Sequence, residues 1–119
     1  MVIPPPSEAF WSSLAALVRD ANLVIDRPRG SRHPRYPDAV YPLDYGYLAD
    51  TRSGDEAGID VWVSSSNSQE VTGIVCTVDT DKRDAEIKIL LGCTETDLGK
   101  IIAFHSQGSQ KAWGLLREP

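Results

Sequence analysis

The chain has 119 residues, a net charge of −5 at pH 7 and a pI near 4.9. A chain of this length can bury one hydrophobic core, and its acidic balance argues against a general nucleic-acid-binding protein, which is normally basic. No apolar run is long enough to span a membrane, and the N-terminus lacks the charged and apolar regions of a signal peptide. We therefore expect one domain over residues 1–119, in the cytoplasm, without nucleic-acid or membrane partners.

The first twenty residues predict a leader followed by a helix. Pro4-Pro5-Pro6 cannot be helical, so residues 1–7 form a Pro-rich leader. Ser7 is a candidate N-cap. Apolar residues then recur at helical spacing, which predicts an amphipathic helix over residues 8–20.

Several short strands follow. Residues 23–25 begin the first strand, and the Pro- and Gly-containing stretch 27–38 predicts a loop. Residues 59–64, 71–78 and 85–91 read as further strands. Strand alternation places Asp60, Trp62 and Ser64 on one face of their strand, and Asp84, Glu86 and Lys88 on one face of theirs.

A second helix is predicted near residues 97–106. Thr94 or Thr96 can cap it, and Gly108 can stop it. Short strands with turn signals, flanked by two helices, favour a small barrel over a parallel sheet. The two cysteines, Cys76 and Cys93, lack metal-type spacing and are expected to be reduced thiols.

The segment Tyr41–Tyr47 lies between residues of opposite charge. Upstream of it is the basic run 27–36, with Arg27, Arg29, Arg32 and Arg35. Downstream are two acidic clusters, namely Asp55, Glu56 and Asp60, then Asp79, Asp81, Asp84 and Glu86. A basic loop beside converging carboxylates suits a phosphate held through a hard divalent cation, because oxygen ligands select Mg²⁺ or Mn²⁺.

The order of these blocks resembles the soluble family I inorganic pyrophosphatases, over roughly residues 23–106. The family pattern runs from an E-I-P-x-G-S-like opening through K-Y, Y-P-x-N-Y-G-[FY] and D-x-D-P-x-D-V to a late D-x4-D. The counterparts in this chain are Asp26–Ser31, Arg35-Tyr36, Tyr41–Tyr47, Asp55–Val61 and Asp79–Asp84.

The resemblance implies a mainly β (α+β) fold, a five-stranded, OB-like closed barrel with an N-terminal and a C-terminal helix. It also implies Mg²⁺-dependent hydrolysis of inorganic pyrophosphate to phosphate, with Mn²⁺ as an alternative metal, in a homo-oligomer. The metal ligands that it implies are Asp26, Asp55, Asp60, Asp79 and Asp84. It assigns substrate binding to Arg29, Arg32, Arg35 and Tyr45, and catalysis to Asp55, Asp60, Tyr45 and Arg35.

The residues themselves support these roles unequally. Asp60 interrupts an apolar run, and a buried carboxylate needs a partner or a metal. For Asp79, the favoured alternative to a metal ligand is a solvent-exposed residue in a turn. The basic run 27–36 has a similar alternative, a solvated surface loop whose arginines pair with nearby acids. Tyr41 and Tyr47 are expected in the core, and His33 and His105 as structural residues.

The chain also departs from the family pattern. Ala57 stands where the family has the carboxylate that activates water, and a methyl group cannot accept a proton. Glu86 replaces a phosphate-contacting lysine. Only residues 37–40 join the second block to the third, too few for the family's arginine-bearing hairpin, and Gly108-Ser109 stands at the C-terminal Tyr-Lys pair. The alternative function is therefore an impaired, pyrophosphatase-like binding or regulatory protein that retains metal or phosphate binding. A nucleic-acid-binding barrel is the weakest alternative.

Overall fold

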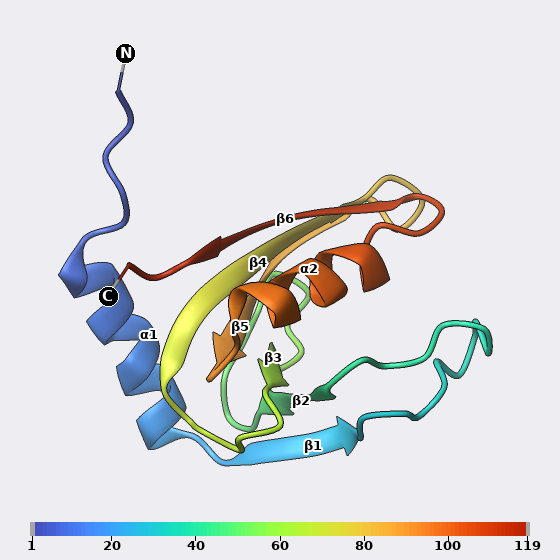
Figure 1. Cartoon of the computed structure of the whole chain (residues 1–119), viewed down its shortest axis with the longest axis horizontal. Coiled ribbons are helices and arrows are strands. Elements are labelled where there is room, and N and C mark those ends of the chain that lie inside the picture. Colours follow the sequence, from blue (N-terminus) through green and yellow to red (C-terminus); the bar gives the residue numbers. More distant parts are fainter. Residues whose placement is uncertain (1, 119) are drawn as a thin grey trace.

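The structure is a computed structural model and describes residues 2–118 (Figure 1). Its elements are α1 (Glu8–Asp20), β1 (Leu23–Arg27), β2 (Asp44–Leu48), β3 (Ile59–Val63), β4 (Val71–Asp79), β5 (Asp84–Leu91), α2 (Glu95–Phe104) and β6 (Gln110–Leu116). Both predicted helices and the predicted strands are present. Neither described helix combines the length and apolarity that crossing a membrane would require.

The strands form one mixed sheet in the order β1-β2-β3-β5-β4-β6. Only β3 and β5 run parallel, and the other neighbours are antiparallel. The prediction of a closed, five-stranded barrel is wrong in these two details, because the described sheet has six strands and is open between β1 and β6. The physical reason is that β6 pairs along β4 from Asp79 to Gly73 and so occupies the edge of β4 that closure would need.

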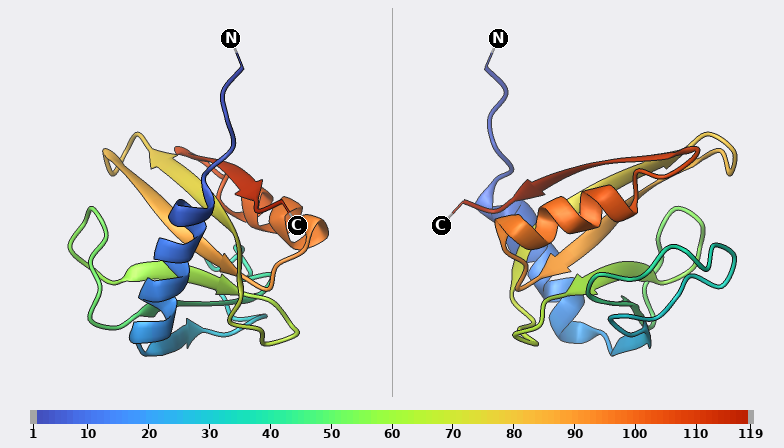
Figure 2. Two further views of the ribbon diagram at one scale, coloured as in Figure 1. Left: turned by 90° about the vertical axis from the view of Figure 1, so that its left-hand side faces the viewer. Right: turned by 45° about the vertical axis from the view of Figure 1, so that its right-hand side comes forward.

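The second predicted helix is present, and a sixth strand follows it. The capping box of Thr94 and Asp97 starts α2, which ends at Phe104 with His105 as its C-cap. Gly108 then has a φ of +59° in the turn that leads into β6. The second helix is therefore followed by a strand that adds to the sheet (Figure 2).

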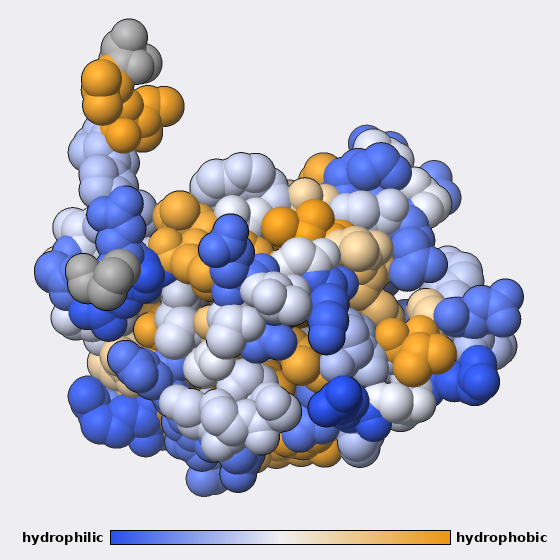
Figure 3. Space-filling view, in the orientation of Figure 1, coloured by the Kyte–Doolittle hydropathy of each residue, from blue (hydrophilic) through white to orange (hydrophobic). Residues whose placement is uncertain are grey.

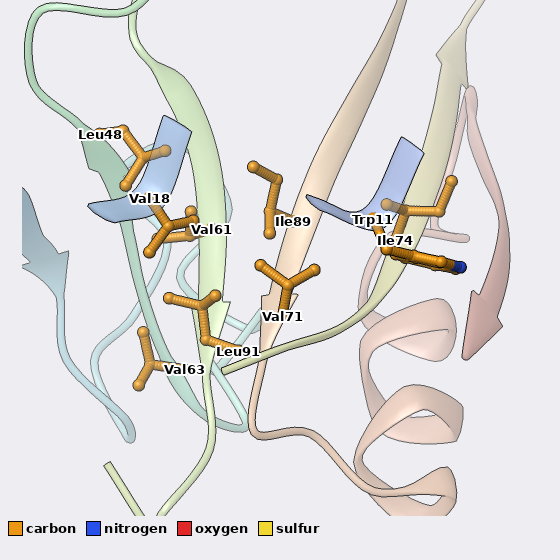
Figure 4. Packing of buried hydrophobic residues seen from close by; sticks show 9 residues of the cluster. All are labelled: Trp11, Val18, Leu48, Val61, Val63, Val71, Ile74, Ile89 and Leu91. Atoms are coloured by element: carbon orange, nitrogen blue, oxygen red, sulfur yellow. The ribbon is translucent and has the colours of Figure 1, made fainter. Parts of the chain in front are cut away.

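One core lies between α1 and the sheet. The side chain of Ser7 accepts a hydrogen bond from the Phe10 backbone N–H, which caps α1 as predicted. Trp11 and Val18 of α1 are buried against residues of β2 to β5. The cluster shown in Figure 4 consists of Trp11, Val18, Leu48, Val61, Val63, Val71, Ile74, Ile89 and Leu91.

A second core lies on the opposite face, beneath α2. Its buried members are Tyr41, Leu43, Trp62, Val75, Leu90, Cys93 and Ile101. Tyr41 thus belongs to the core, as the sequence indicated. Trp62 and Leu90 come from β3 and β5, and the residues that precede them on the same face are polar. The candidate site begins where this apolar face becomes charged.

Gly46 is required in the Tyr-Gly-Tyr stretch because β1 lies very close. A Cβ at this position would overlap the carbonyl oxygen of Val24. Gly46 pairs with Ile25 on one side and with Val61 on the other. The glycine therefore allows β2 to sit between its neighbours and fixes the position of Tyr45.

Candidate functional site

The pairing of β3 with β5 brings Asp60 next to Lys88. Val61 pairs with Ile89 in the parallel register, so the residue that precedes each lies at the same level of the sheet. Both Asp60 and Lys88 point to the face that carries Trp62 and Leu90, as strand alternation predicted. Glu86 and Asp84 follow on the same face of β5.

Lys88 is buried, and three oxygen atoms surround its ammonium group. Its Nζ lies 2.7 Å from Asp60 Oδ2, 3.1 Å from Glu86 Oε2 and 2.9 Å from the Tyr45 hydroxyl. The lysine side chain is 5% exposed, against 29% for Asp60 and 13% for Glu86. An ammonium group has three donors, so these contacts use all of them.

These residues line a cavity of about 190 Å³ at the end of α2. Its acidic members are Asp55, Asp60, Asp84 and Glu86, and its other polar members include Tyr45, Lys82, Lys88, His105 and Gln110. The structure thus brings Tyr45, Asp55, Asp60 and Asp84 together, all of which the sequence had selected. Lys88 also pairs with Glu86, which stands in place of a lysine in the family pattern, so the negative charge of Glu86 is partly offset.

The carboxyl groups of Asp55 and Glu86 differ in their tendency to ionise. Hydrogen bonds from the Ser53 hydroxyl and the Ala57 backbone N–H lower the pKa of Asp55. Burial raises the pKa of Glu86, and Lys88 opposes that rise. Burial, with the Asp60 carboxylate, raises the pKa of Tyr45 far above its ordinary value. Tyr45 is therefore a neutral O–H donor at the cavity wall.

A buried histidine closes one side of the cavity. The Trp62 indole N–H donates to His105 Nε2 at 3.1 Å, and His105 Nδ1 lies 3.3 Å from Gln110 Oε1. Nε2 therefore accepts, and Nδ1 carries the proton. Burial and the nearby Lys88 lower the pKa of His105 to about 3. His105 is a neutral, structural residue, in line with the prediction from the sequence.

Two of the predicted metal ligands lie outside this cavity. The Asp79 carboxylate accepts hydrogen bonds from the backbone N–H groups of Asp81 and Lys82 and from the Ser109 hydroxyl. These contacts lower its pKa and tie it to the β4–β5 turn. Asp26 is exposed on the edge strand β1 and does not line the cavity.

The arginine loop, residues 28–43, lies beside the cavity and contributes no lining residue to it. The backbone N–H of Arg29 donates to Asp44 at 2.8 Å, and the guanidinium of Arg32 donates to the Pro37 carbonyl at 2.8 Å. Arg35 is exposed. None of the three predicted anion-binding arginines therefore lines the cavity around Lys88.

The chemistry of the cavity suits a magnesium ion that arrives with a phosphate. Within residues 2–118, no three Asp, Glu, His or Cys side chains are close enough together to hold a metal. Lys88 already occupies one oxygen each of Asp60 and Glu86. Mg²⁺ usually binds one or two carboxylates and keeps water or substrate phosphates as its other ligands. Asp55 and Asp84 fit that role, but the residues do not form a cage for the metal alone.

Lys88 is the site residue that the sequence analysis overlooked. The available signal was the one used for Asp60, a charged residue inside an apolar run, here Ile87-Lys88-Ile89-Leu90. A buried lysine needs partners as much as a buried aspartate does. What the sequence could not supply was the parallel register that makes these two residues partners.

Comparison with solved structures shows the fold. Three bacterial proteins match at 16% sequence identity, namely an inorganic pyrophosphatase from Neisseria gonorrhoeae, an inorganic phosphatase from Anaplasma phagocytophilum and an inorganic pyrophosphatase from Helicobacter pylori. Their TM-scores are 0.57, 0.57 and 0.55; the matches cover 75%, 79% and 80% of this chain and 77%, 81% and 80% of theirs. No family model and no curated protein matches the sequence. The chain therefore has a pyrophosphatase-like fold.

Proposed function

We propose that this chain binds inorganic pyrophosphate together with Mg²⁺, or Mn²⁺, and hydrolyses it slowly, as a weakened inorganic diphosphatase. The proposed site is the cavity of about 190 Å³ around Lys88, named the Lys88 cavity from here on. The observation that carries the proposal is that Asp55, Asp60 and Asp84 line one cavity with Tyr45. These four residues come from three separate blocks of the pyrophosphatase-like sequence pattern, Tyr41–Tyr47, Asp55–Val61 and Asp79–Asp84. Their convergence in a pyrophosphatase-like fold supports a common role.

Each group has a distinct part in this proposal. Asp55 stays ionised because its pKa is lowered, so that it is a ligand or water-holding group at neutral pH. Tyr45 donates a hydrogen bond from its hydroxyl to a phosphate oxygen, and Lys82 at the cavity wall adds positive charge. Lys88 orients Asp60 and Glu86. When bound, the metal supplies charge neutralisation and a more acidic water.

A second candidate is a protein that binds the same ligand without turning it over. Ala57 favours this function, because it leaves the position of the water-activating carboxylate empty. Glu56 does not replace that group, since it is exposed and does not line the cavity. A general base typically contributes about 10²–10⁴-fold to a rate. The two candidates therefore differ in turnover and not in the site that they use.

The test is phosphate release from pyrophosphate, measured with and without Mg²⁺. Asp55→Asn and Asp84→Asn should lower the metal-dependent rate by about tenfold or more if each ligates the metal or its water. Asp50→Asn is the matched control, because Asp50 is an exposed aspartate outside the cavity. Binding without release would support the second candidate. Equal rates in all three variants would remove the carboxylates from the site.

A further inference from the structure

A second, larger cleft adjoins the Lys88 cavity. It has a volume of about 460 Å³ and lies between the arginine loop and the β4–β5 turn. Both segments extend to the same side of the molecule in Figures 1 and 2, and they form two neighbouring, largely hydrophilic lobes on the right of Figure 3. Lys82, Phe104 and Gln110 line both hollows, so that the two adjoin.

The sizes of the two hollows suit different parts of one ligand. Small-molecule pockets typically measure about 300–1,000 Å³. The Lys88 cavity, called the inner cavity here, measures about 190 Å³ and is below that range. The second cleft, called the outer cleft, is within it. Pyrophosphate alone would leave the outer cleft unused. A phosphoanhydride that carries an organic group would fill both.

The outer cleft presents aromatic rings to that organic group. The rings of His33 and Tyr36 lie 5.1 Å apart, and the ring of Tyr41 lies behind His33, parallel to it within 6°. Tyr36 is 62% exposed and lines the cleft together with Phe104. An exposed ring beside a phosphate-binding site suits a planar nucleobase, because any base can stack on it.

The charges around the cleft suit the phosphate chain. Burial lowers the pKa of His33, and the positive charges of Lys82, Arg27 and Arg35 lower it further. Of these cations, Lys82 lines the cleft, and Arg27 and Arg35 lie outside its lining. Asp79 also lines the cleft, but its Oδ1 accepts from two backbone N–H groups of the turn and from the Ser109 hydroxyl. The other acid on the wall, Asp81, is exposed and adjoins Lys82.

We infer that the outer cleft binds the nucleoside part of a nucleoside diphosphate or triphosphate. The base lies against Tyr36 and His33, and the phosphates pass Lys82 toward the inner cavity. This inference rests on the proposed function, because the inner cavity must first accept a metal-bound phosphoanhydride.

Calorimetry with ADP and with pyrophosphate, both with Mg²⁺, tests the inference. ADP should bind about tenfold more tightly than pyrophosphate, the gain expected from one stacked base. Tyr36→Ala should remove this advantage, and Tyr36→Phe should keep it. Trp113→Ala is the matched control, because Trp113 is 61% exposed and lies on β6 outside the cleft.

The outcomes separate the two proposals. If pyrophosphate binds and ADP binds no more tightly, the outer cleft is not a nucleoside site and the proposed function stands. An advantage of ADP that survives in Tyr36→Ala would also overturn the inference. If neither ligand binds, both proposals are wrong.

Discussion

The ammonium group of Lys88 lies 2.7 Å from the carboxylate of Asp60, across the only parallel pair of strands in the described sheet. Each residue interrupts an apolar run, and each would be costly to bury alone. Together with Glu86 and Tyr45 they form a polar cluster with a cation at its centre. The carboxylates are thus held together by an internal charge before any metal binds.

Removing that charge should destabilise the protein. Lys88→Met leaves the carboxylates of Asp60 and Glu86 close together without their cation. Breaking a buried ion pair in this way costs about 3–5 kcal/mol. We expect about 3 kcal/mol in the free energy of unfolding, because the Asp60 side chain keeps 29% exposure to water. Urea unfolding at neutral pH measures the difference.

A neutral cluster provides the control for Lys88→Met. The triple variant Lys88→Met, Asp60→Asn, Glu86→Gln removes all three charges and should recover most of the lost stability. If Lys88→Met and the triple variant are equally unstable, the loss comes from packing and not from unpaired charge.

Freeing the carboxylates should also change metal binding. Without its ammonium group, Lys88→Met exposes oxygens of Asp60 and Glu86 to a divalent ion. Added Mg²⁺ should then raise the melting temperature of Lys88→Met more than that of the parent, by mass action. An equal rise in both proteins would show that Lys88 does not compete with metal.

Asp79 should affect stability and not ligand binding. Its carboxylate holds the β4–β5 turn through the N–H groups of Asp81 and Lys82 and through Ser109. Asp79→Ala should therefore lower the melting temperature and leave the affinity for pyrophosphate with Mg²⁺ within about twofold. A selective loss of affinity, with normal melting, would return Asp79 to the metal ligands.

His105 should make stability fall in mild acid. The pKa of His105 is lowered to about 3 in the folded protein, against an ordinary value of 6.5. Below pH 6.5 the unfolded chain binds a proton that the folded protein excludes, so stability decreases as the pH falls toward 3. Between pH 6.5 and 5 the loss should be about 1–2 kcal/mol.

Denaturant unfolding across that range measures the effect of His105, and His105→Gln should flatten the dependence. His33→Asn is the comparison, because the pKa of His33 is also lowered and contributes with the same sign. A pH dependence unchanged by His105→Gln would contradict the burial of a neutral imidazole.

Ala57→Asp should restore part of the missing catalysis. Ala57 is exposed and, like Glu56, does not line the cavity, but its backbone N–H donates to Asp55, so a carboxylate there lies beside a cavity residue and does not disturb the core. We expect phosphate release to rise by about tenfold or more, toward the ~10²–10⁴-fold typical of a general base. Glu86→Lys would restore the lysine of the family pattern, but it should destabilise the protein by placing a second ammonium beside Lys88. A faster and equally stable Ala57→Asp, Glu86→Lys variant would contradict that expectation.

The sequence predicted local structure well and closure of the sheet poorly. Helical spacing and the candidate caps, Ser7 for the first helix and Thr94 or Thr96 for the second, defined both helices, and alternation placed Asp60 and Glu86 on the correct faces. These properties depend on neighbouring residues. The open sheet depends on β6, whose short residues Ala112 and Gly114 carry little strand signal.

The candidate site was partly predictable for the same reason. Motif order selected Tyr45, Asp55, Asp60 and Asp84, which share a cavity. It could not show that Lys88 lies among them, because that contact depends on the register between strands about thirty residues apart in the chain. Nor could it show that the side chain of Asp79 is tied into a turn.

The most direct test of this account is a calorimetric titration of pyrophosphate into the protein, with and without Mg²⁺. The account predicts binding that requires Mg²⁺ and that weakens by about tenfold in Asp55→Asn, since the carboxylates hold the phosphate only through the metal. Binding of equal strength without the metal, or none under either condition, would contradict it.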